Sequence, residues 1–246
     1  MRKLGIIGGL GPFATIEFLD KFYNLYRQTY TPKKDQDFPN ISIEMACSTP
    51  DRTSFILGKD CSVNPKDSLK ESIVKLLQLG SNTIFCPCNT VYYFLEDAFS
   101  EVKALANYNT DDLILISPIK EAAHFIMQNF YNKAMQKPVL ILGTDGTIFA
   151  NTYKTEFLKH GISVLYPDAD MQDAVMKIIY SNEYGIKLHG KNNKACEELK
   201  KVLKFYQYKY SLVLLACSEL PICYDSKDEL VFDPIEIACD KLVKIL

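Results

Sequence analysis

The stretch LGIIGGLGPFATIEFLDKF, residues 4–22, contains the pattern that decides the fold. It begins with a short apolar run without charged residues, which is typical of a strand buried on both faces of a parallel sheet. Glycines at 8, 9 and 11 interrupt the run, and Pro12 suits the first turn of a helix. From there apolar residues recur at i, i+3 and i+4, as on the buried face of a helix. The stretch therefore predicts a strand, a glycine turn and a crossover helix.

The same pattern recurs at residues 139–157, VLILGTDGTIFANTYKTEF. When the two stretches are aligned, Gly8 falls on Gly143 and Gly11 on Gly146. Further along the chain, TIFCPCNT and LVLLACSE each place a cysteine at the end of an apolar run. This internal similarity indicates two related lobes.

Apolar strand-like runs and amphipathic helical segments alternate along the whole chain, which is typical of parallel sheets with crossover helices. We predict an α/β protein of two pseudo-symmetric lobes, each a parallel-rich sheet flanked by helices, with the active site in the cleft between the lobes. The expected lobes are residues 1–117 together with 225–246, and residues 118–224. The predicted strands lie in residues 3–9, 40–46, 83–89, 113–118, 138–144, 161–167 and 210–219.

The composition favours a small-molecule function. The chain has 246 residues, with 28 Lys and Arg against 30 Asp and Glu, so its net charge of -2 provides no general attraction for nucleic acid or an anionic membrane. No apolar run approaches the ~20 residues of a membrane span. Eight cysteines in such a chain are expected to be reduced, and we predict a cytoplasmic protein. Cys86 and Cys88 lack the spacing of a zinc site, so no metal is expected.

The glycine turn has three interpretations. Gly9 to Ala14 fits the dinucleotide pattern G-x-G-x-x-A, but the next predicted strand does not end in the acidic residue that would hold a ribose hydroxyl. The second interpretation is an anion-binding turn, in which Gly11 allows close approach and the helix dipole attracts a carboxylate or phosphate. A plain strand-to-helix turn is the third.

Cys88 and Cys217 are the strongest candidates for chemistry. Cys86 lies within an apolar strand and is interpreted as core. Cys88 follows Pro87 at the strand end, where Asn89 and Thr90 are expected to open a helix whose N-terminus would stabilise a thiolate. Cys217 occupies the matching place in the second lobe. Two thiols from opposite walls of one cleft suit racemisation or epimerisation, in which one removes a proton from a carbon and the other returns it to the opposite face.

Such a reaction also needs groups that stabilise negative charge on the substrate. Asn89, Thr90 and Ser218 offer amides and hydroxyls beside the thiols. Arg52 could bind a carboxylate through two parallel hydrogen bonds, although it could equally be a surface charge of a loop.

The motifs GGLGPFAT, PDRT, PCNT and CSELP, in this order, resemble those of the aspartate/glutamate racemase family, and its aspartate racemase branch in particular. The resemblance extends over the whole chain. It implies two α/β lobes, a two-base mechanism without a cofactor, a dicarboxylic amino acid as substrate, and a homodimer. By this resemblance Cys88 and Cys217 are the catalytic pair. The residues that it assigns to the substrate are Leu10, Arg52, Thr53, Asn89, Thr90, Val91, Thr144, Lys187, Ser218 and Glu219.

Arg52 and Lys187 would both bind the distal carboxylate, with Lys187 in a segment, YGIKLHG, that resembles the family's GIK segment. One departure from the family pattern is Tyr92, which stands where a histidine is usual. Two alternatives to an aspartate or glutamate racemase stay open, of which the second is favoured by the missing histidine. One is a lyase or isomerase acting on a non-amino diacid such as malonate or maleate, and the other is a carboxylate-binding protein without activity.

Overall fold

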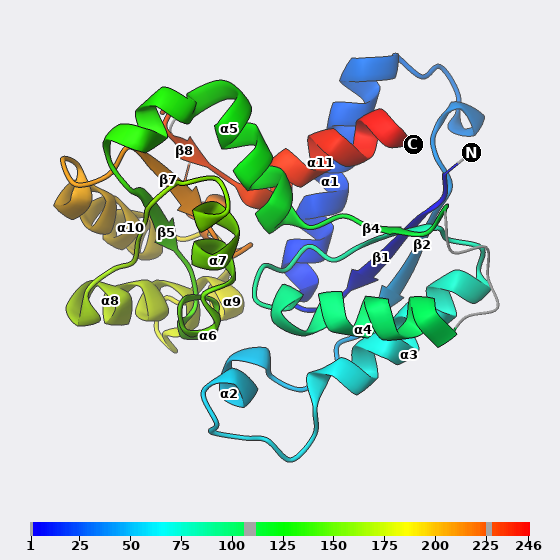
Figure 1. Ribbon diagram of the computed structural model, residues 1–246, viewed down its shortest axis with the longest axis horizontal. Helices are drawn as coiled ribbons and strands as arrows, with labels where there is room; N and C mark the ends of the chain where they lie inside the picture. Colours follow the sequence, from blue (N-terminus) through cyan, green and yellow to red (C-terminus); the bar gives the residue numbers. More distant parts are fainter. Residues whose placement is uncertain (1, 106–111, 225–227) are drawn as a thin grey trace. The chain divides into compact units, whose positions relative to one another are not determined.

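The computed structural model describes residues 2–105, 112–224 and 228–246. The chain forms two compact units, one of Met1–Pro118 with Ile235–Leu246 and the other of Ile119–Pro234. Each unit contains a four-stranded parallel sheet with helices packed on it (Figure 1). The predicted α/β class with two lobes is confirmed.

The sheet of the first unit has the order β2-β1-β3-β4. The inner strands β1 and β3 are buried along their whole length, as their continuous apolar runs predict. The edge strand β2 exposes Ile43 and Met45. The four strands are β1 (Leu4–Gly8), β2 (Ile41–Met45), β3 (Thr83–Phe85) and β4 (Ile114–Leu115).

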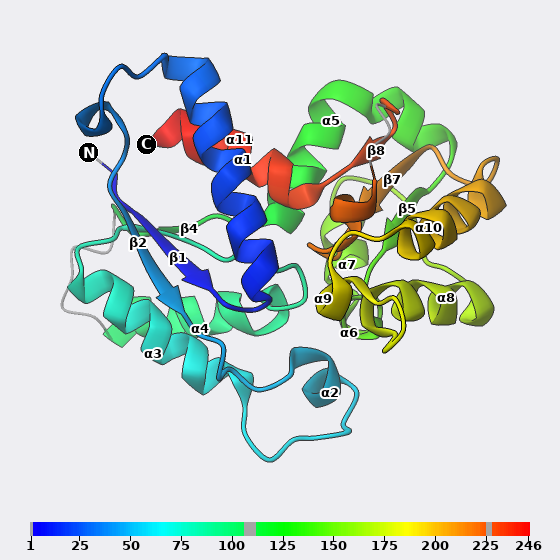
Figure 2. The same cartoon turned by 180° about the vertical axis from the view of Figure 1, so that it is seen from behind.

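Helices cover both faces of this sheet. Helices α1 (Pro12–Tyr30) and α11 (Pro234–Ile245) lie on one face, and α3 (Pro65–Gln78) and α4 (Tyr92–Leu105) lie on the other (Figures 1 and 2). On the α1 side, the rings of Phe18 and Phe85 pack with their centroids 4.8 Å apart. Among the described residues of this unit, the short helices are η1 (Asp35–Asp37) and α2 (Arg52–Ile56).

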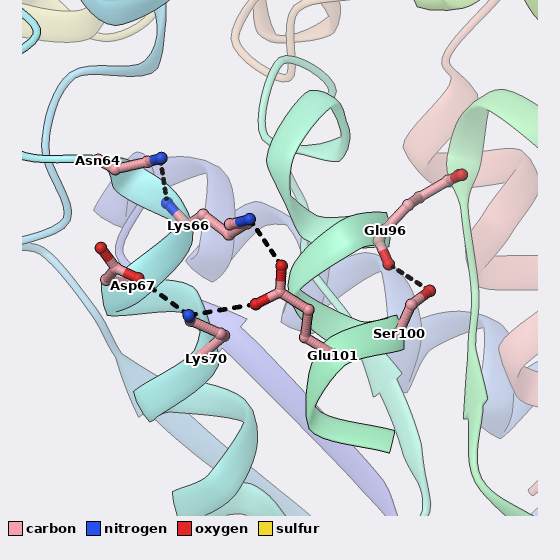
Figure 3. A network of polar contacts seen from close by, with 7 residues as sticks. All are labelled: Asn64, Lys66, Asp67, Lys70, Glu96, Ser100 and Glu101. Atoms are coloured by element: carbon pink, nitrogen blue, oxygen red, sulfur yellow. Dashed lines mark hydrogen bonds and ion pairs between the residues drawn. The ribbon is translucent and has the colours of Figure 1, made fainter. Parts of the chain in front are cut away.

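Ion pairs join α3 to α4 at the protein surface (Figure 3). The Glu101 carboxylate accepts hydrogen bonds from Lys66 Nζ at 2.7 Å and from Lys70 Nζ at 3.2 Å. Lys70 also pairs with Asp67, at 3.0 Å. Asn64 caps α3, since its Oδ1 accepts a hydrogen bond from the Lys66 backbone N–H. These contacts hold α4, the helix that follows the Cys88 segment, against α3.

The sheet of the second unit has the order β6-β5-β7-β8, which repeats the order of the first sheet strand for strand. This repeat is the structural counterpart of the internal similarity in the sequence. Cys88 follows β3, Cys217 follows β7, and these two strands are equivalent. The strands are β5 (Val139–Leu142), β6 (Val164–Leu165), β7 (Leu212–Leu215) and β8 (Val231–Phe232).

The helix predicted after β5 is divided in two, unlike its counterpart α1. Asn151 adopts a left-handed conformation, φ 54°, which ends one helix and begins the next. The helices of this unit are α5 (Pro118–Gln136), α6 (Asp145–Ala150), α7 (Thr152–Leu158), α8 (Ala169–Tyr180), α9 (Ile186–His189), α10 (Asn193–Tyr206) and η3 (Leu220–Cys223).

β8 was not among the predicted strands. It pairs with β7, with Val213 opposite Val231 and Leu214 opposite Phe232, and therefore joins the second unit. The second unit extends through Pro234 for this reason. A boundary at 224/225, as the sequence suggests, would separate β8 from its sheet. Residue 225 itself lies outside the described residues.

Candidate active site

Cys88 lies at the carboxyl end of the inner strand β3. Its backbone N–H donates a hydrogen bond to the Cys86 carbonyl at 2.8 Å, and only 7% of the residue is exposed. Helix α4 begins at Tyr92, not at Asn89 as predicted. One turn separates the thiol from the helix, and the Tyr92 N–H donates to the Asn89 carbonyl at 3.3 Å. The predicted strand-end location is therefore correct, whereas the predicted helix start is wrong by this turn.

The turn after Cys88 consists of Asn89, Thr90 and Val91, all of them buried. The Val91 carbonyl accepts hydrogen bonds from the backbone N–H groups of Phe94 and Leu95, both at 2.9 Å. The turn is thus anchored to the first residues of α4. Its two polar side chains lie next to Cys88 in the chain, at the carboxyl end of a parallel strand, where α/β sheets place their ligands.

Tyr92 fixes the end of β3 to the end of β4. Its hydroxyl donates to the Ile116 carbonyl at 2.7 Å and accepts a hydrogen bond from the Cys86 N–H at 3.2 Å. Tyr92 is 2% exposed, and burial raises its pKa. Sequence reasoning treated this residue only as a missing histidine and did not find its structural role.

Cys86 is completely buried, in agreement with its interpretation as core. Burial is the main reason that the pKa of its thiol lies well above the ordinary value, and the nearby Cys88 thiol adds to this effect. The Arg52 charge opposes both.

Arg52 begins α2 and is partly buried. Its Nη1 donates to the carbonyls of Pro50 at 3.2 Å and Thr49 at 3.4 Å. Its Nε is buried and makes no hydrogen bond within the described part of the chain. Asp51 caps the same helix by accepting a hydrogen bond from the Ser54 N–H at 2.6 Å, and Thr53 follows in its first turn. These contacts hold Arg52 in place, unlike a mobile surface charge.

In the glycine turn after β1, the residue whose backbone conformation requires glycine is Gly9, and not Gly11. Gly9 has φ +84°, and a Cβ there would lie 2.8 Å from Cys47 Sγ. Gly11 has an extended conformation and precedes α1. The Thr15 hydroxyl accepts a hydrogen bond from the Gly9 N–H at 3.0 Å and donates to the Gly11 carbonyl at 3.1 Å. Leu10 lies between the two glycines and is buried.

In the second unit, four of the predicted residues form one hydrogen-bonded group. The Cys217 thiol donates to Glu219 Oε2 at 3.0 Å, and the Ser218 hydroxyl donates to the same oxygen at 3.2 Å. Lys187, on α9, forms an ion pair with the other oxygen, Oε1. The Lys187 ammonium also lies over the Tyr180 ring, 5.6 Å from its centroid. Sequence reasoning missed Tyr180, for which no motif provided a signal.

The electrostatics of this group follow from its burial. Burial disfavours the Glu219 carboxylate, but the Lys187 charge and the hydrogen bonds that it accepts outweigh this effect, so its pKa is lowered. Burial raises the pKa of the Cys217 thiol well above the ordinary value, and the Glu219 charge raises it further while Lys187 lowers it. Burial disfavours the charge of Lys187 too, but Glu219 reverses this and the pKa of Lys187 is raised. Cys217 is therefore a protonated thiol beside an ion pair.

Thr144 caps α6 and lies next to the Cys217 strand. Its hydroxyl accepts a hydrogen bond from the Thr147 N–H at 3.3 Å. The preceding residue, Gly143, is packed so closely that a Cβ there would lie 3.2 Å from the Ala216 carbonyl oxygen. The turn that contains Thr144 is thus close to the residue before Cys217.

Among the described residues, no three side chains of His, Cys, Asp or Glu are grouped as a metal site would require. No helix in the described ranges combines the length and apolar composition that crossing a membrane demands.

Comparison with known proteins identifies the fold. No family model matches the chain. The broad specificity amino-acid racemase RacX of Bacillus subtilis is 27% identical over 176 residues, which are 72% of this chain and 69% of that protein. Among solved structures, the aspartate racemase of Picrophilus torridus is similar with a TM-score of 0.76 at 24% identity, over 99% of this chain and 94% of that one. The glutamate racemase of Francisella tularensis in complex with D-glutamate has a TM-score of 0.64 at 16% identity, over 100% and 80% of the two chains.

These similarities confirm the predicted resemblance. The chain shares the α/β fold of aspartate and glutamate racemases along its whole length. The proteins that it resembles are racemases, which belong to the isomerases.

Proposed function

We propose that this chain, which has the fold of the aspartate and glutamate racemases, is an amino-acid racemase that interconverts L- and D-aspartate or glutamate without a cofactor. The observation that supports this proposal most strongly is the equivalence of Cys88 and Cys217. Each follows the third strand of a sheet, and the two sheets have the same strand order. In this proposal the two thiols act on opposite faces of the same α-carbon.

The reaction needs one thiolate and one thiol. The thiolate removes the proton from the α-carbon, and the thiol gives its proton to the other face, so that the configuration is inverted. The two cysteines then have exchanged protonation states and are ready for the opposite enantiomer. The α-proton of an amino acid is weakly acidic, so the site must stabilise the negative charge that develops. The buried residues Asn89 and Thr90 and the partly buried Ser218 are suited to this task by their places beside the thiols.

In this proposal two cations, Arg52 and Lys187, bind the distal carboxylate and so select a dicarboxylic substrate. The Arg52 Nε has no hydrogen-bond partner among the described residues, and Lys187 is held near Cys217 through Glu219. An arginine can bind a carboxylate with two parallel hydrogen bonds, which fixes both its distance and its orientation. Further substrate contacts are proposed for Leu10, Thr53, Val91, Thr144 and Glu219, of which Glu219 would contribute through its backbone.

The proposal is tested by incubating the purified protein with each enantiomer of aspartate, glutamate and several neutral amino acids in D₂O, with no pyridoxal phosphate added. We expect inversion of aspartate or glutamate, accompanied by deuterium at the α-carbon, as seen by NMR and chiral chromatography. Absence of both effects for every dicarboxylic amino acid would refute the proposal. Decarboxylation of malonate or isomerisation of maleate by the same preparation would instead favour a lyase or isomerase.

The resemblance also leads us to propose a cytoplasmic homodimer. Light scattering on the purified chain, of which one copy has a mass of 28.0 kDa, measures the oligomeric state. A monomer at micromolar concentration would contradict the dimer but would leave the proposed chemistry unaffected.

A further inference from the structure

Glu219 is a buried carboxylate whose oxygens are already engaged by the protein. Only 4% of the residue is exposed. Oε2 accepts hydrogen bonds from Cys217 and Ser218, and Oε1 is paired with Lys187. A carboxylate in this position would also repel an anionic substrate. The side chain of Glu219 is thus arranged to act on its protein neighbours and not on a dicarboxylate.

The first unit has no equivalent of this carboxylate. In the aligned motifs PCNT and ACSE, the residue two positions after the cysteine is Thr90 in the first unit and Glu219 in the second. Cys217 can donate its proton to an anion at 3.0 Å, whereas the corresponding side chain beside Cys88 is a neutral hydroxyl. The duplication therefore preserves the thiols but not their charged surroundings.

We propose that Glu219 is a positioning residue that holds Cys217 in its protonated form, with the S–H bond directed to the carboxylate, while Lys187 keeps that carboxylate ionised. The role of Glu219 in turnover rests on the proposed function. It makes the two thiols unequal before any substrate binds: Cys217 favours the role of acid for the enantiomer that Cys88 deprotonates, and it must first lose its proton to act as the base for the other enantiomer.

The Cys88 thiolate takes the α-proton with formation of an S–H bond, and the Cys217 S–H bond breaks as its proton forms the new C–H bond. The electron pair remains on Cys217, so a thiolate is left beside Glu219. Lys187 offsets part of the resulting negative charge, because it lies on the other side of the same carboxylate. Reprotonation of Cys217 restores the hydrogen bond to Glu219.

Within the described part of the chain, two charged groups act on Cys217, and a titratable ring contacts one of them. Glu219 follows β7, Lys187 lies on α9, and Tyr180 at the end of α8 contacts Lys187. Glu219 and Lys187 act on the Cys217 thiol with opposite signs. Their removal should therefore shift its titration in opposite directions, which a general loosening of the fold would not do.

The test measures the rate at which iodoacetamide alkylates Cys217 as a function of pH, in the full chain and without substrate, with mass spectrometry of the peptide that contains Cys217. Only the thiolate reacts, so the midpoint of the profile reports the pKa of the thiol. In Glu219→Gln we expect the midpoint to fall by at least ~1 unit, which makes alkylation about tenfold faster below the midpoint. In Lys187→Gln we expect the midpoint to rise.

Glu156→Gln is the matched control, since Glu156 is a buried glutamate of the same unit that is paired with Lys159. It should leave the Cys217 profile unchanged. An unchanged midpoint in Glu219→Gln, or midpoints that move in the same direction in Glu219→Gln and Lys187→Gln, would overturn the inference. If Glu219→Gln does not fold, the test rests on Lys187→Gln alone. A Cys217 midpoint that does not rise in Lys187→Gln then overturns the inference. Because no substrate is present, opposite shifts in a chain that fails to racemise any amino acid would refute the proposed function alone.

Discussion

The two cysteines that follow the equivalent strands differ in their immediate neighbours. Cys217 donates a hydrogen bond to a carboxylate whose charge is balanced by Lys187. Cys88 follows Pro87 and precedes a turn of buried polar and apolar residues, with a neutral Thr90 in the place of Glu219. A racemase needs one thiol and one thiolate at the same time, so neighbours of different charge are suited to separating the two roles.

Replacement of Arg52 by Gln should impair the use of dicarboxylic substrates. Loss of a charge-assisted hydrogen bond to the distal carboxylate costs roughly 1.5–3 kcal/mol, which corresponds to a decrease of about 10–100-fold in kcat/KM. The decrease must be equal for both enantiomers, since L- and D-forms have the same free energy. Arg52→Lys keeps the charge but not the two parallel hydrogen bonds, and should recover only part of the activity.

Steady-state kinetics with aspartate and glutamate measures these effects. Lys59→Gln provides a control, because Lys59 is an exposed cation in the loop after α2. Wild-type kcat/KM in Arg52→Gln would contradict the role of Arg52 in substrate binding.

At the residue scale, the sequence allowed the thiols and several of their neighbours to be selected, but not the contacts among them. Cys88 and Cys217 each end an apolar run, and the internal similarity makes them a pair. Lys187 and Glu219 lie on different elements, and no spacing in the sequence reveals that their side chains meet. The same holds for Tyr92, whose hydroxyl bonds to backbone groups at the ends of two strands.

At the scale of elements, the strands and helices with long apolar patterns were predicted well. Helix α1 (Pro12–Tyr30) begins at Pro12, as the sequence predicts. The two-residue strand β8 was missed because Val231 and Phe232 are too short an apolar run to be distinguished from a loop. The break between α6 and α7 was also missed, since it depends on a left-handed Asn151 that the helical pattern does not signal.

Tyr92→Phe should destabilise the protein without abolishing its activity. The Cys86 N–H and the Ile116 carbonyl would lose their shared buried partner, at a cost of about 1–3 kcal/mol. Urea unfolding measures the loss, with Tyr93→Phe as control because Tyr93 is 48% exposed. Equal stability of the two variants would show that the Tyr92 hydroxyl does not brace the strand ends.

Glu101→Gln should weaken the packing of α3 against α4 in a pH-dependent way. Hydrogen bonds from Lys66 and Lys70 lower the pKa of Glu101, so the folded protein favours its ionised form. This contribution to stability is fully present above the unfolded pKa of about 4.3 and is lost as the pH falls through the lower folded value. The contribution is small because these side chains are partly exposed.

Thermal unfolding of wild type and Glu101→Gln between pH 3 and pH 7 checks the sign of this effect. We expect the variant to have the lower Tm at pH 7 and the two Tm values to converge toward pH 3. A difference that grows as the pH falls would contradict the ion-pair explanation.

At the scale of the whole molecule, the central feature is a duplication. Two sheets share one strand order, and in each the third strand ends next to a cysteine. The sequence motifs predicted this arrangement because the glycine turns and the cysteines recur in the same order. The proposed function adds that both cysteines act on the same α-carbon, one on each face.

The most direct test of that claim uses a substrate analogue that reports removal of the α-proton by a single thiol. In 3-chloroaspartate, loss of the α-proton leads to loss of chloride, so each α-epimer can react without a second base. We predict that wild type releases chloride from both α-epimers, Cys88→Ser from only one, and Cys217→Ser from only the other, with Cys61→Ser as an exposed-thiol control that resembles wild type. Chloride release by both cysteine variants from the same epimer, or by either variant from both, would contradict the two-thiol account.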